Sequence, residues 1–333
     1  MNRKYINVLK SRNRKSIPGI IFDIFKLTIA KKELPVHYFS RLLYLKNQTS
    51  INNYLWLSDI KGISNNHFNQ NAYAYLFEDK IIFNDIMTKL EIPVPKFHGF
   101  IANDKYISEN NIYKLKTREA IEEILNKICL ENNCDLFLKP VNGMNGRGCF
   151  SFTSSSEISL DNYSDIKNNI YVIQEKIKQH PELNKIFPNS INTIRINTIH
   201  NGVKTVHLCS VLRFGVNNRE VDNGGAFISI DNNGHLVAPA YSFLEYGGNT
   251  YEKHPNTKVG LNNFKVPYFQ EAISLAVKSA EEFPSKIIGW DVAITEHGPV
   301  IIEGNHNPHL GMADIAFGGL KKSNLFVENI LDL

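Results

Sequence analysis

The chain has 333 residues, 43% of them hydrophobic, and its 37 Lys and Arg against 33 Asp and Glu give a formal net charge of +4. This balance excludes a disordered chain and an integral membrane protein, and the length predicts two or three structural units. The charge excess is too small to indicate nucleic-acid binding. The cysteines form no C-x-x-C pair and fit no zinc-site spacing, which predicts reduced thiols in the cytoplasm. They are Cys129, Cys134, Cys149 and Cys209.

The positive charge is concentrated at the N-terminus. Six basic residues and no acid lie before Ser16, and a short apolar run from Ile17 to Phe25 follows. Because Pro18 and Asp23 interrupt it, this run predicts neither a transmembrane helix nor a signal peptide. Two interpretations stay open, a solvated basic terminus and a patch that contacts anionic lipid.

Helical patterns dominate the first part of the chain. Residues 1–78 are expected to be helical, and Tyr38–Leu45 is interpreted as a packed helix face. A helix is predicted from Phe77 to Lys89, where Ile92–Pro95 leads into extended chain. The next predicted helix spans Thr117–Asn132.

Strand patterns dominate the second part. Asn201-Gly202 lies between two runs of alternating residues and predicts a hairpin. Mixed strands with segregated helices favour an α+β or mixed α/β fold over a regular Rossmann alternation. The predicted strands are 136–138, 171–173, 192–200, 203–213, 227–230, 235–238, 287–295 and 300–303, with a helix over 268–282.

A glycine-rich segment follows the first of these strands. Lys139 ends the strand, and the loop after it contains Gly143, Asn145, Gly146 and Gly148. Glycines let backbone N–H groups approach an anion closely, so the loop is a candidate phosphate site. It matches neither a Walker A motif nor a dinucleotide fingerprint, and a purely structural hairpin is the alternative.

A second motif lies where the strand at 171–173 ends. Gln174, Glu175, Lys176 and Ile177 form a polar exit, and Glu182 follows seven residues after Glu175. Such an edge could offer backbone groups to adenine and a carboxylate to ribose. A solvated strand end with a surface ion pair is the alternative.

The third motif is a group of oxygen donors near the C-terminus. Asp291 and Glu303 lie twelve residues apart around a tight turn, and Asn305 follows two residues later. This spacing predicts three side chains on one face of two antiparallel strands. Such donors suit Mg²⁺ held jointly with phosphate oxygens. The alternative is a structural carboxylate pair satisfied by Lys or Arg.

Taken in this order, the motifs resemble the ATP-grasp superfamily over residues 78–333. The resemblance implies two α+β subdomains that sandwich ATP, with divisions at 1–78, 79–178 and 179–333 and a helical N-terminal region. It implies that Lys80 and Lys139 contact the phosphates and that 174–177 bind adenine. It further implies that Glu182 binds ribose, and that Asp291, Glu303 and Asn305 hold Mg²⁺, with two ions expected.

Narrower motifs are similar to the sugar-transfer-associated ATP-grasp group, which is linked with surface-polysaccharide pathways. They are Gln179–Glu182, Asn192–Arg195, Gly289–Asp291 and Glu303–Asn305. Arg195, Arg213 and the turn Asn223-Gly224-Gly225 also resemble ligases that add amino acids to a carboxylate.

The resemblance implies an ATP-dependent carboxylate–amine ligase that works through an acyl phosphate, with Lys139, Arg195 and Arg213 as catalytic residues. The expected substrates are a carboxylate and an amine, such as an amino acid and a uronic acid of a glycan. The alternatives are a carboxylate–amine ligase that acts on free peptides or metabolites, a phosphotransferase such as a sugar kinase, and a non-catalytic nucleotide-binding module. The expected location is the cytoplasm, with peripheral contact to the membrane or a lipid-linked glycan, and residues 1–78 are a candidate acceptor cap.

Overall fold

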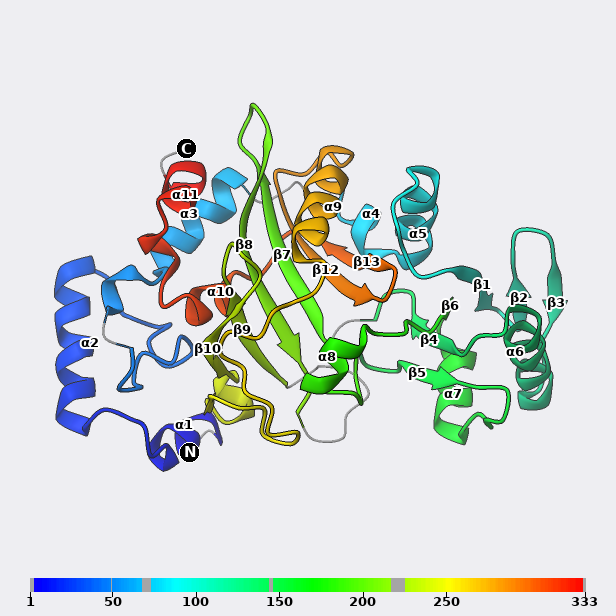
Figure 1. Cartoon of the computed structure of the whole chain (residues 1–333), viewed down its shortest axis with the longest axis horizontal. Helices are drawn as coiled ribbons and strands as arrows, with labels where there is room; N and C mark the ends of the chain where they lie inside the picture. The colour runs from blue at the N-terminus through cyan, green and yellow to red at the C-terminus, as the bar shows by residue number, and fades with distance from the viewer. Residues whose placement is uncertain (1–2, 49, 68–72, 144–145, 217–224, 332–333) are drawn as a thin grey trace.

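The computed structural model describes residues 3–48, 50–67, 73–143, 146–216 and 225–331. Two antiparallel sheets lie next to each other along the long axis of the molecule, and the N-terminal helices lie at one end of it (Figure 1). The predicted α+β fold class is therefore confirmed. Within the described residues, every helix is too short or too polar to cross a membrane.

The N-terminal region contains separate helices rather than a continuous helical domain. Ser16 caps the second of them, because its side chain accepts a hydrogen bond from the backbone of Gly19. The helices are α1 (Arg3–Lys10), α2 (Ile17–Lys31), η1 (Ile51–Asn53) and α3 (Leu57–His67).

The helix predicted over Tyr38–Leu45 is wrong, because this segment is a succession of turns. Leu42 has φ +57, outside the helical region. Leu42 and the next three residues are all buried. One face of a helix cannot bury four consecutive residues, so the turns allow a burial that a helix would not.

The smaller sheet has six strands. Its core lies between the sheet and two helices, α6 (Arg118–Asn132) and α7 (Leu160–Asn168). The strand order is β3 (Ile112–Lys114), β2 (Lys105–Ile107), β1 (Phe97–Ala102), β6 (Tyr171–Glu175), β4 (Leu136–Pro140) and β5 (Phe150–Phe152).

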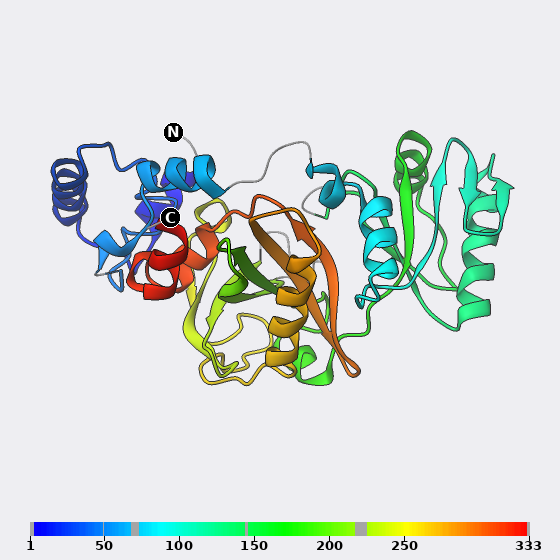
Figure 2. The same ribbon diagram turned by 90° about the horizontal axis from the view of Figure 1, so that it is seen from above.

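The larger sheet has seven strands and a core on each face. Helix α9 (Phe269–Glu281) covers one face, while α10 (Gly311–Ala316) and the N-terminal region cover the other (Figure 2). The strand order is β11 (Thr250–Tyr251), β10 (Leu236–Tyr241), β9 (Ala226–Ile230), β8 (Thr205–Phe214), β7 (Thr193–His200), β12 (Ile287–Thr295) and β13 (Gly298–Asn305).

The connecting segments are short. Helix α8 (Pro181–Ile186) joins the two sheets, and η3 (Leu244–Tyr246) follows β10. The chain ends in η4 (Leu320–Lys322), α11 (Asn324–Phe326) and η5 (Val327–Leu331).

The helix predicted over Phe77–Lys89 is interrupted. It consists of α4 (Tyr75–Glu78) and α5 (Lys80–Lys89), with Asp79 in an extended conformation between them. The Asp79 carboxylate accepts hydrogen bonds from the backbone N–H groups of Ile81 and Ile82 at 2.9 and 3.1 Å. Aspartate at this position starts a new helix, because it satisfies backbone donors that have no partner within the helix.

The predicted division of the chain at 78/79 stays a prediction. Phe83 and Met87 of α5 pack into the core of the larger sheet, together with Phe77 of α4. Helix α5 therefore packs against the larger sheet, although in the chain it comes just before the first strand of the smaller sheet.

Candidate active site

The glycine-rich segment joins two antiparallel strands, β4 and β5. Lys139 lies in β4 opposite Val172 and is 6% exposed. Gly146 and Gly148 have φ values of +66 and +71, which side-chain-bearing residues rarely adopt. A Cβ atom on Gly148 would lie 2.8 Å from the hydroxyl of Tyr171, which donates a hydrogen bond to the Gly148 carbonyl. Glycine is therefore required for this close approach to β6.

Lys80 holds the start of this loop. Lys80 is the first residue of α5, and its side chain extends to the loop. It donates hydrogen bonds to the carbonyls of Val141 and Gly143, at 2.8 and 2.9 Å. Lys80, which the sequence predicts to contact phosphate, therefore already positions the loop through these two hydrogen bonds. Asn145 lies outside the described residues.

The two lysines share one electrostatic environment. Burial lowers the pKa of Lys139 to about 8; the nearby Glu303 carboxylate opposes this shift, and the Lys80 ammonium adds to it. Burial also lowers the pKa of Lys80, against the same carboxylate. The thiol of Cys149, whose own pKa is raised by burial, lies close to both amines. The structure therefore brings Lys80, Lys139 and Glu303 together from three separate segments.

The predicted adjacency of the oxygen donors is confirmed. Asp291 of β12 pairs directly with Glu303 of β13, and Asn305 pairs with Gly289. The register shifts immediately after Asp291, so the two strands bulge beside the carboxylates. The amide nitrogen of Asn305 donates to the Gly289 carbonyl at 3.3 Å, which directs its amide oxygen away from that backbone.

Two arginines hold Asp291. Arg195 lies directly opposite it on β7 and forms a bidentate pair, with Nε–Oδ1 at 2.5 Å and Nη2–Oδ2 at 2.9 Å. Arg213 of β8 reaches the same carboxylate, with Nη1–Oδ2 at 3.0 Å. Two of the predicted catalytic residues and one predicted metal ligand thus form a single network, in which Arg195 and Asp291 are buried and Arg213 is partly buried. For Asp291, this arrangement matches the alternative given above, in which Lys or Arg satisfies the carboxylates.

The two carboxylates of the site have opposite electrostatics. Burial alone would raise the pKa of Asp291, but the guanidinium groups of Arg195 and Arg213 outweigh it and hold the pKa below its usual range. Burial and the neighbouring Asp291 charge raise the pKa of Glu303, while Lys139 opposes the rise. Glu303 is therefore the carboxylate that would gain most from a cation.

The donor set fits Mg²⁺ in chemical type, since all three side chains offer oxygen. Both Asp291 oxygens accept from arginine, so Asp291 would bind a cation directly only by giving up an arginine contact.

The predicted adenine-binding edge follows β6. Gln174 is buried, whereas Glu175, Lys176 and Ile177 are partly exposed as the chain leaves the sheet. The Lys176 N–H donates to the Asp135 carbonyl at 2.8 Å, which fixes the direction of the exit. Recognition of the adenine edge by these partly exposed residues stays a prediction.

The other predicted nucleotide contacts are less well defined. Glu182 lies on α8, where both its oxygens accept from Lys185 at 2.7 and 2.8 Å, so its proposed ribose contact competes with an exposed ion pair. Gly225 lies immediately before β9 and is partly buried. Asn223 and Gly224 lie outside the described residues.

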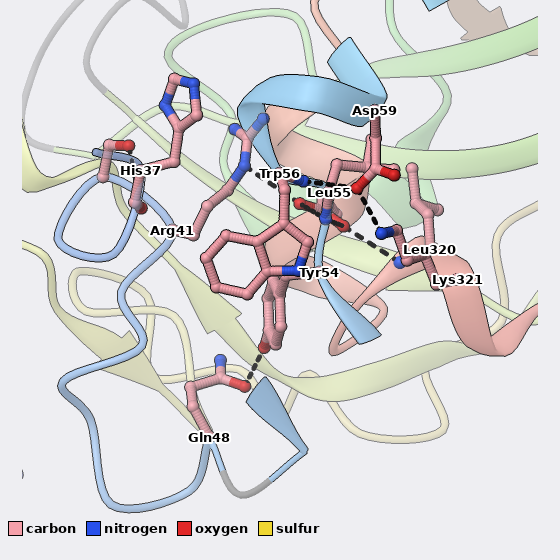
Figure 3. A network of polar contacts seen from close by, with 11 residues as sticks. His37, Arg41, Gln48, Tyr54, Leu55, Trp56, Asp59, Leu320 and Lys321 are labelled. Carbon is pink, nitrogen blue, oxygen red and sulfur yellow. Dashed lines mark hydrogen bonds and ion pairs between the residues drawn. The ribbon is translucent and has the colours of Figure 1, made fainter. Parts of the chain in front are cut away.

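A buried ion pair ties the N-terminal region to this part of the molecule (Figure 3). Nε of Arg41 lies 3.0 Å from Oδ2 of Asp314, in α10, and both side chains are at least 95% buried. Asp314 also accepts from the backbone N–H groups of Leu55 and Leu320, at 3.1 and 3.0 Å. No sequence motif identified this network, because its members are isolated residues from opposite ends of the chain.

Arg41 also lies close to His309, which is within electrostatic reach of Arg195 in the candidate site. A Cβ atom on Gly311 would meet Nη1 of Arg41 at 2.0 Å and the His309 ring at 2.3 Å, so these two groups are neighbours. Burial, together with the charges of Arg41 and Arg195, lowers the pKa of His309 to about 4. His309 is therefore a neutral imidazole that lies beside the Arg41 guanidinium and within electrostatic reach of Arg195. It connects the N-terminal region to the candidate site.

A separate side-chain group lies behind the predicted adenine edge. Donor atoms of His98, Cys134 and Glu175 all lie within 4.8 Å of one another, a spacing that could hold a metal ion. The Cys134 Sγ atom is 3.9 Å from Nε2 of His98, which a weak thiol–imidazole hydrogen bond also explains. Glu175 pairs with Leu136, which faces the α6 core. This group is therefore distinct from the Lys139 side of the sheet.

Comparison of the sequence with known protein families identifies one match. The model of the sugar-transfer-associated ATP-grasp family matches residues 64–328. No curated protein matches significantly.

Solved structures with a related arrangement share little sequence. D-alanyl-alanine synthetase A from Vibrio cholerae is 11% identical, with a TM-score of 0.43 over 77% of this chain and 65% of that one. N5-carboxyaminoimidazole synthase from Aspergillus clavatus is 11% identical, with a TM-score of 0.44 over 79% and 56%. The ATP-grasp ligase PsnB is 12% identical, with a TM-score of 0.41 over 74% and 58%. The chain thus spans less than two thirds of each of these structures.

The family match covers most of the chain, including both sheets and every site residue predicted from the sequence. The chain belongs to the sugar-transfer-associated ATP-grasp family.

Proposed function

We propose that the protein is an ATP-dependent carboxylate–amine ligase that forms an amide through an acyl phosphate. The observation that carries this proposal is the convergence of Lys139, Glu303, Asp291 and its two arginines, from both sheets. Cationic groups beside a carboxylate and an amide oxygen are what ATP phosphates and a divalent ion require. Family membership supports ATP as the nucleotide.

The proposed first step phosphorylates the carboxylate substrate. One carboxylate oxygen attacks the γ-phosphorus of ATP, the bond from that phosphorus to the ADP oxygen breaks, and ADP leaves. Lys139 lies at the end of β4, where its ammonium group would neutralise phosphate oxygens during the transfer. Arg195 and Arg213 would approach the acyl phosphate while Asp291 fixes their orientation.

In the second step an amine attacks the activated carbonyl carbon. A C–N bond forms, the bond from that carbon to the phosphate oxygen breaks, and the amine loses a proton to solvent. Gly146 and Gly148 lie in the segment that would cover the acyl phosphate and exclude water. Glu303 and Asn305 would hold Mg²⁺, which when bound supplies positive charge to the phosphate oxygens. We propose two such ions, by resemblance to the family.

The proposed substrates are an amino acid and a sugar acid of a surface polysaccharide or its lipid-linked precursor. Support for an acceptor role of residues 1–78 comes from Arg41, which lies beside His309 and within electrostatic reach of the site. A cytoplasmic location with the basic N-terminus near anionic lipid belongs to the same proposal. It accords with the six basic residues that lie, without any acid, before Ser16.

A substrate screen tests this function. The full chain with ATP and Mg²⁺ is offered uronic acids and amino acids singly and in pairs, and ADP release is measured. A ligase requires both partners for sustained ADP release and yields an amide plus free phosphate. A phosphotransferase leaves phosphate on a hydroxyl without an amine. ATP binding with no product from any pair would indicate a non-catalytic module.

A further inference from the structure

Helix α2 is apolar on the side that the rest of the protein does not cover. Its inner face packs Ile20 and Leu27 into the core, and Asp23 is fixed by Lys15 and the Tyr38 hydroxyl at 2.7 and 2.9 Å. The large side chains on its outer face are 51–65% exposed. They are Ile17, Ile21, Phe22, Phe25 and Ile29.

These five side chains form one continuous stripe. At the helical spacing of 3.6 residues per turn, Ile21, Phe25 and Ile29 follow one another on successive turns, and Phe22 lies beside them. A helix with apolar residues all round is normally buried. Here α2 lies at the outer end of the long axis in both views (Figures 1 and 2). An exposed stripe of this size indicates an interaction surface.

The charge around the stripe favours one kind of partner. Residues 1–32 contain nine Lys or Arg and one Asp, a net charge of +8, whereas the whole chain carries +4. The other 301 residues therefore carry a net charge of −4. Lys10, Arg12 and Lys26 are exposed, and Lys26 extends from α2 itself. An apolar stripe with cationic surroundings is the pattern of a helix that lies in the interface of an anionic bilayer.

We propose that α2 is an interfacial membrane helix that inserts its outer face into a bilayer containing anionic lipid. With 15 residues it is too short to span the hydrocarbon core, so it would lie parallel to the membrane surface. A second copy of the chain is a poorer occupant, because pairing two α2 faces would bring two segments of charge +8 together. This inference extends the proposed lipid contact of the N-terminus to named inserting side chains, and does not depend on the proposed chemistry.

The inserting face is tested by vesicle co-sedimentation of the full chain. The probes are phosphatidylcholine vesicles with and without phosphatidylglycerol. The double substitution Phe22→Ser/Phe25→Ser should lower the partition coefficient on mixed vesicles at least about tenfold, because both rings leave the interface. Binding of the unaltered chain should weaken without phosphatidylglycerol and with added salt.

The matched control is Leu130→Ser/Leu160→Ser. Both leucines are 73% exposed and belong to helices of the smaller sheet. This control should bind vesicles as the unaltered chain does. Equal partitioning of the unaltered chain and the phenylalanine variant would overturn the proposal. So would a dimer, seen by sedimentation velocity without vesicles, that the phenylalanine variant alone disrupts.

Insertion itself is tested with Phe25→Trp. Mixed vesicles should shift its emission to shorter wavelength and brominated lipid should quench it, whereas Leu130→Trp should respond to neither. A Phe25→Trp probe that stays water-exposed on bound protein would contradict insertion. Vesicle binding without any ligase activity would refute the proposed function and leave this inference intact.

Discussion

At the scale of single residues, the carboxylates of the site differ in what surrounds them. Asp291 accepts three arginine contacts, whereas Glu303 faces Asp291 and the amine of Lys139. Asp291 can therefore act by orienting arginines, while Glu303 has the environment of a cation ligand. Their sequence spacing predicted that the two carboxylates would be neighbours. It could not predict this difference, because the arginines come from β7 and β8.

Glu303→Gln removes the carboxylate charge with little change of shape. We expect ADP release to fall at least about 100-fold, because the substitution removes the proposed anionic ligand. Glu296→Gln is the control, since Glu296 is exposed in the turn of the same hairpin. Turnover by Glu303→Gln at the rate of this control would rule out the assigned role of Glu303.

The lowered pKa of Lys139 should make nucleotide binding depend on pH. Its pKa of about 8 means that the amine loses its charge as pH rises through 8, so ATP affinity should decrease between about pH 7 and 9. Titration calorimetry should show this decrease in the unaltered chain. Lys139→Arg stays charged and should flatten the profile. An identical slope in both proteins would exclude Lys139 as its origin.

The same shift has a defined effect on stability. An unfolded lysine keeps its proton up to its ordinary pKa of 10.5, whereas folded Lys139 loses it near 8. The unfolded chain therefore binds more protons between these values, and this group makes the free energy of unfolding rise with pH in that window. Below pH 8 both states are protonated, and the contribution of Lys139 no longer changes.

At the scale of elements, the prediction succeeded where local patterns suffice. The hairpin at Asn201-Gly202 and the helix at α6 follow from alternation, turn chemistry and an apolar stripe. The sequence did not predict the break at Asp79, because apolar residues continue at helical spacing on both sides of it. The turns at Tyr38–Leu45 were missed because their burial depends on contacts with distant segments, among them the larger sheet.

The Arg41–Asp314 pair is the element-scale link between the N-terminal region and α10. Arg41→Leu should lower the free energy of unfolding by about 3–5 kcal/mol, because it leaves a buried carboxylate without its cation. Urea unfolding measures this loss. Lys89→Leu is the control, since its pair with Asp85 is mostly exposed and should contribute little. Equal midpoints for the two variants would mean that the buried pair does not anchor the region.

At the scale of the whole molecule, the proposed site needs both sheets. Lys139 comes from the smaller sheet, and Glu303 and the arginines come from the larger one. The sequence predicted this convergence only through family resemblance, since strand patterns do not specify how two sheets lie together. Residues 1–78 contain no motif that indicates their role. Arg41 comes close to His309 only in the folded chain.

A ligand that bridges the two units should stabilise the whole chain. ATP with Mg²⁺ at about 100 times the dissociation constant should add about 2.7 kcal/mol to the free energy of unfolding. A thermal melt should show a higher midpoint, and excess EDTA should reverse most of the gain. A midpoint that EDTA leaves unchanged would argue against a metal-assisted nucleotide site.

Hydroxylamine converts an acyl phosphate into a hydroxamate, so it reveals whether the protein activates a carboxylate in this way. The full chain is incubated with ATP, Mg²⁺, hydroxylamine and each uronic acid or amino acid in turn. Hydroxamate should form in an amount equal to the ADP released with the correct carboxylate, and both products should be lost in Glu303→Gln. ADP formed together with a phosphorylated hydroxyl group, and no hydroxamate, would contradict activation as an acyl phosphate.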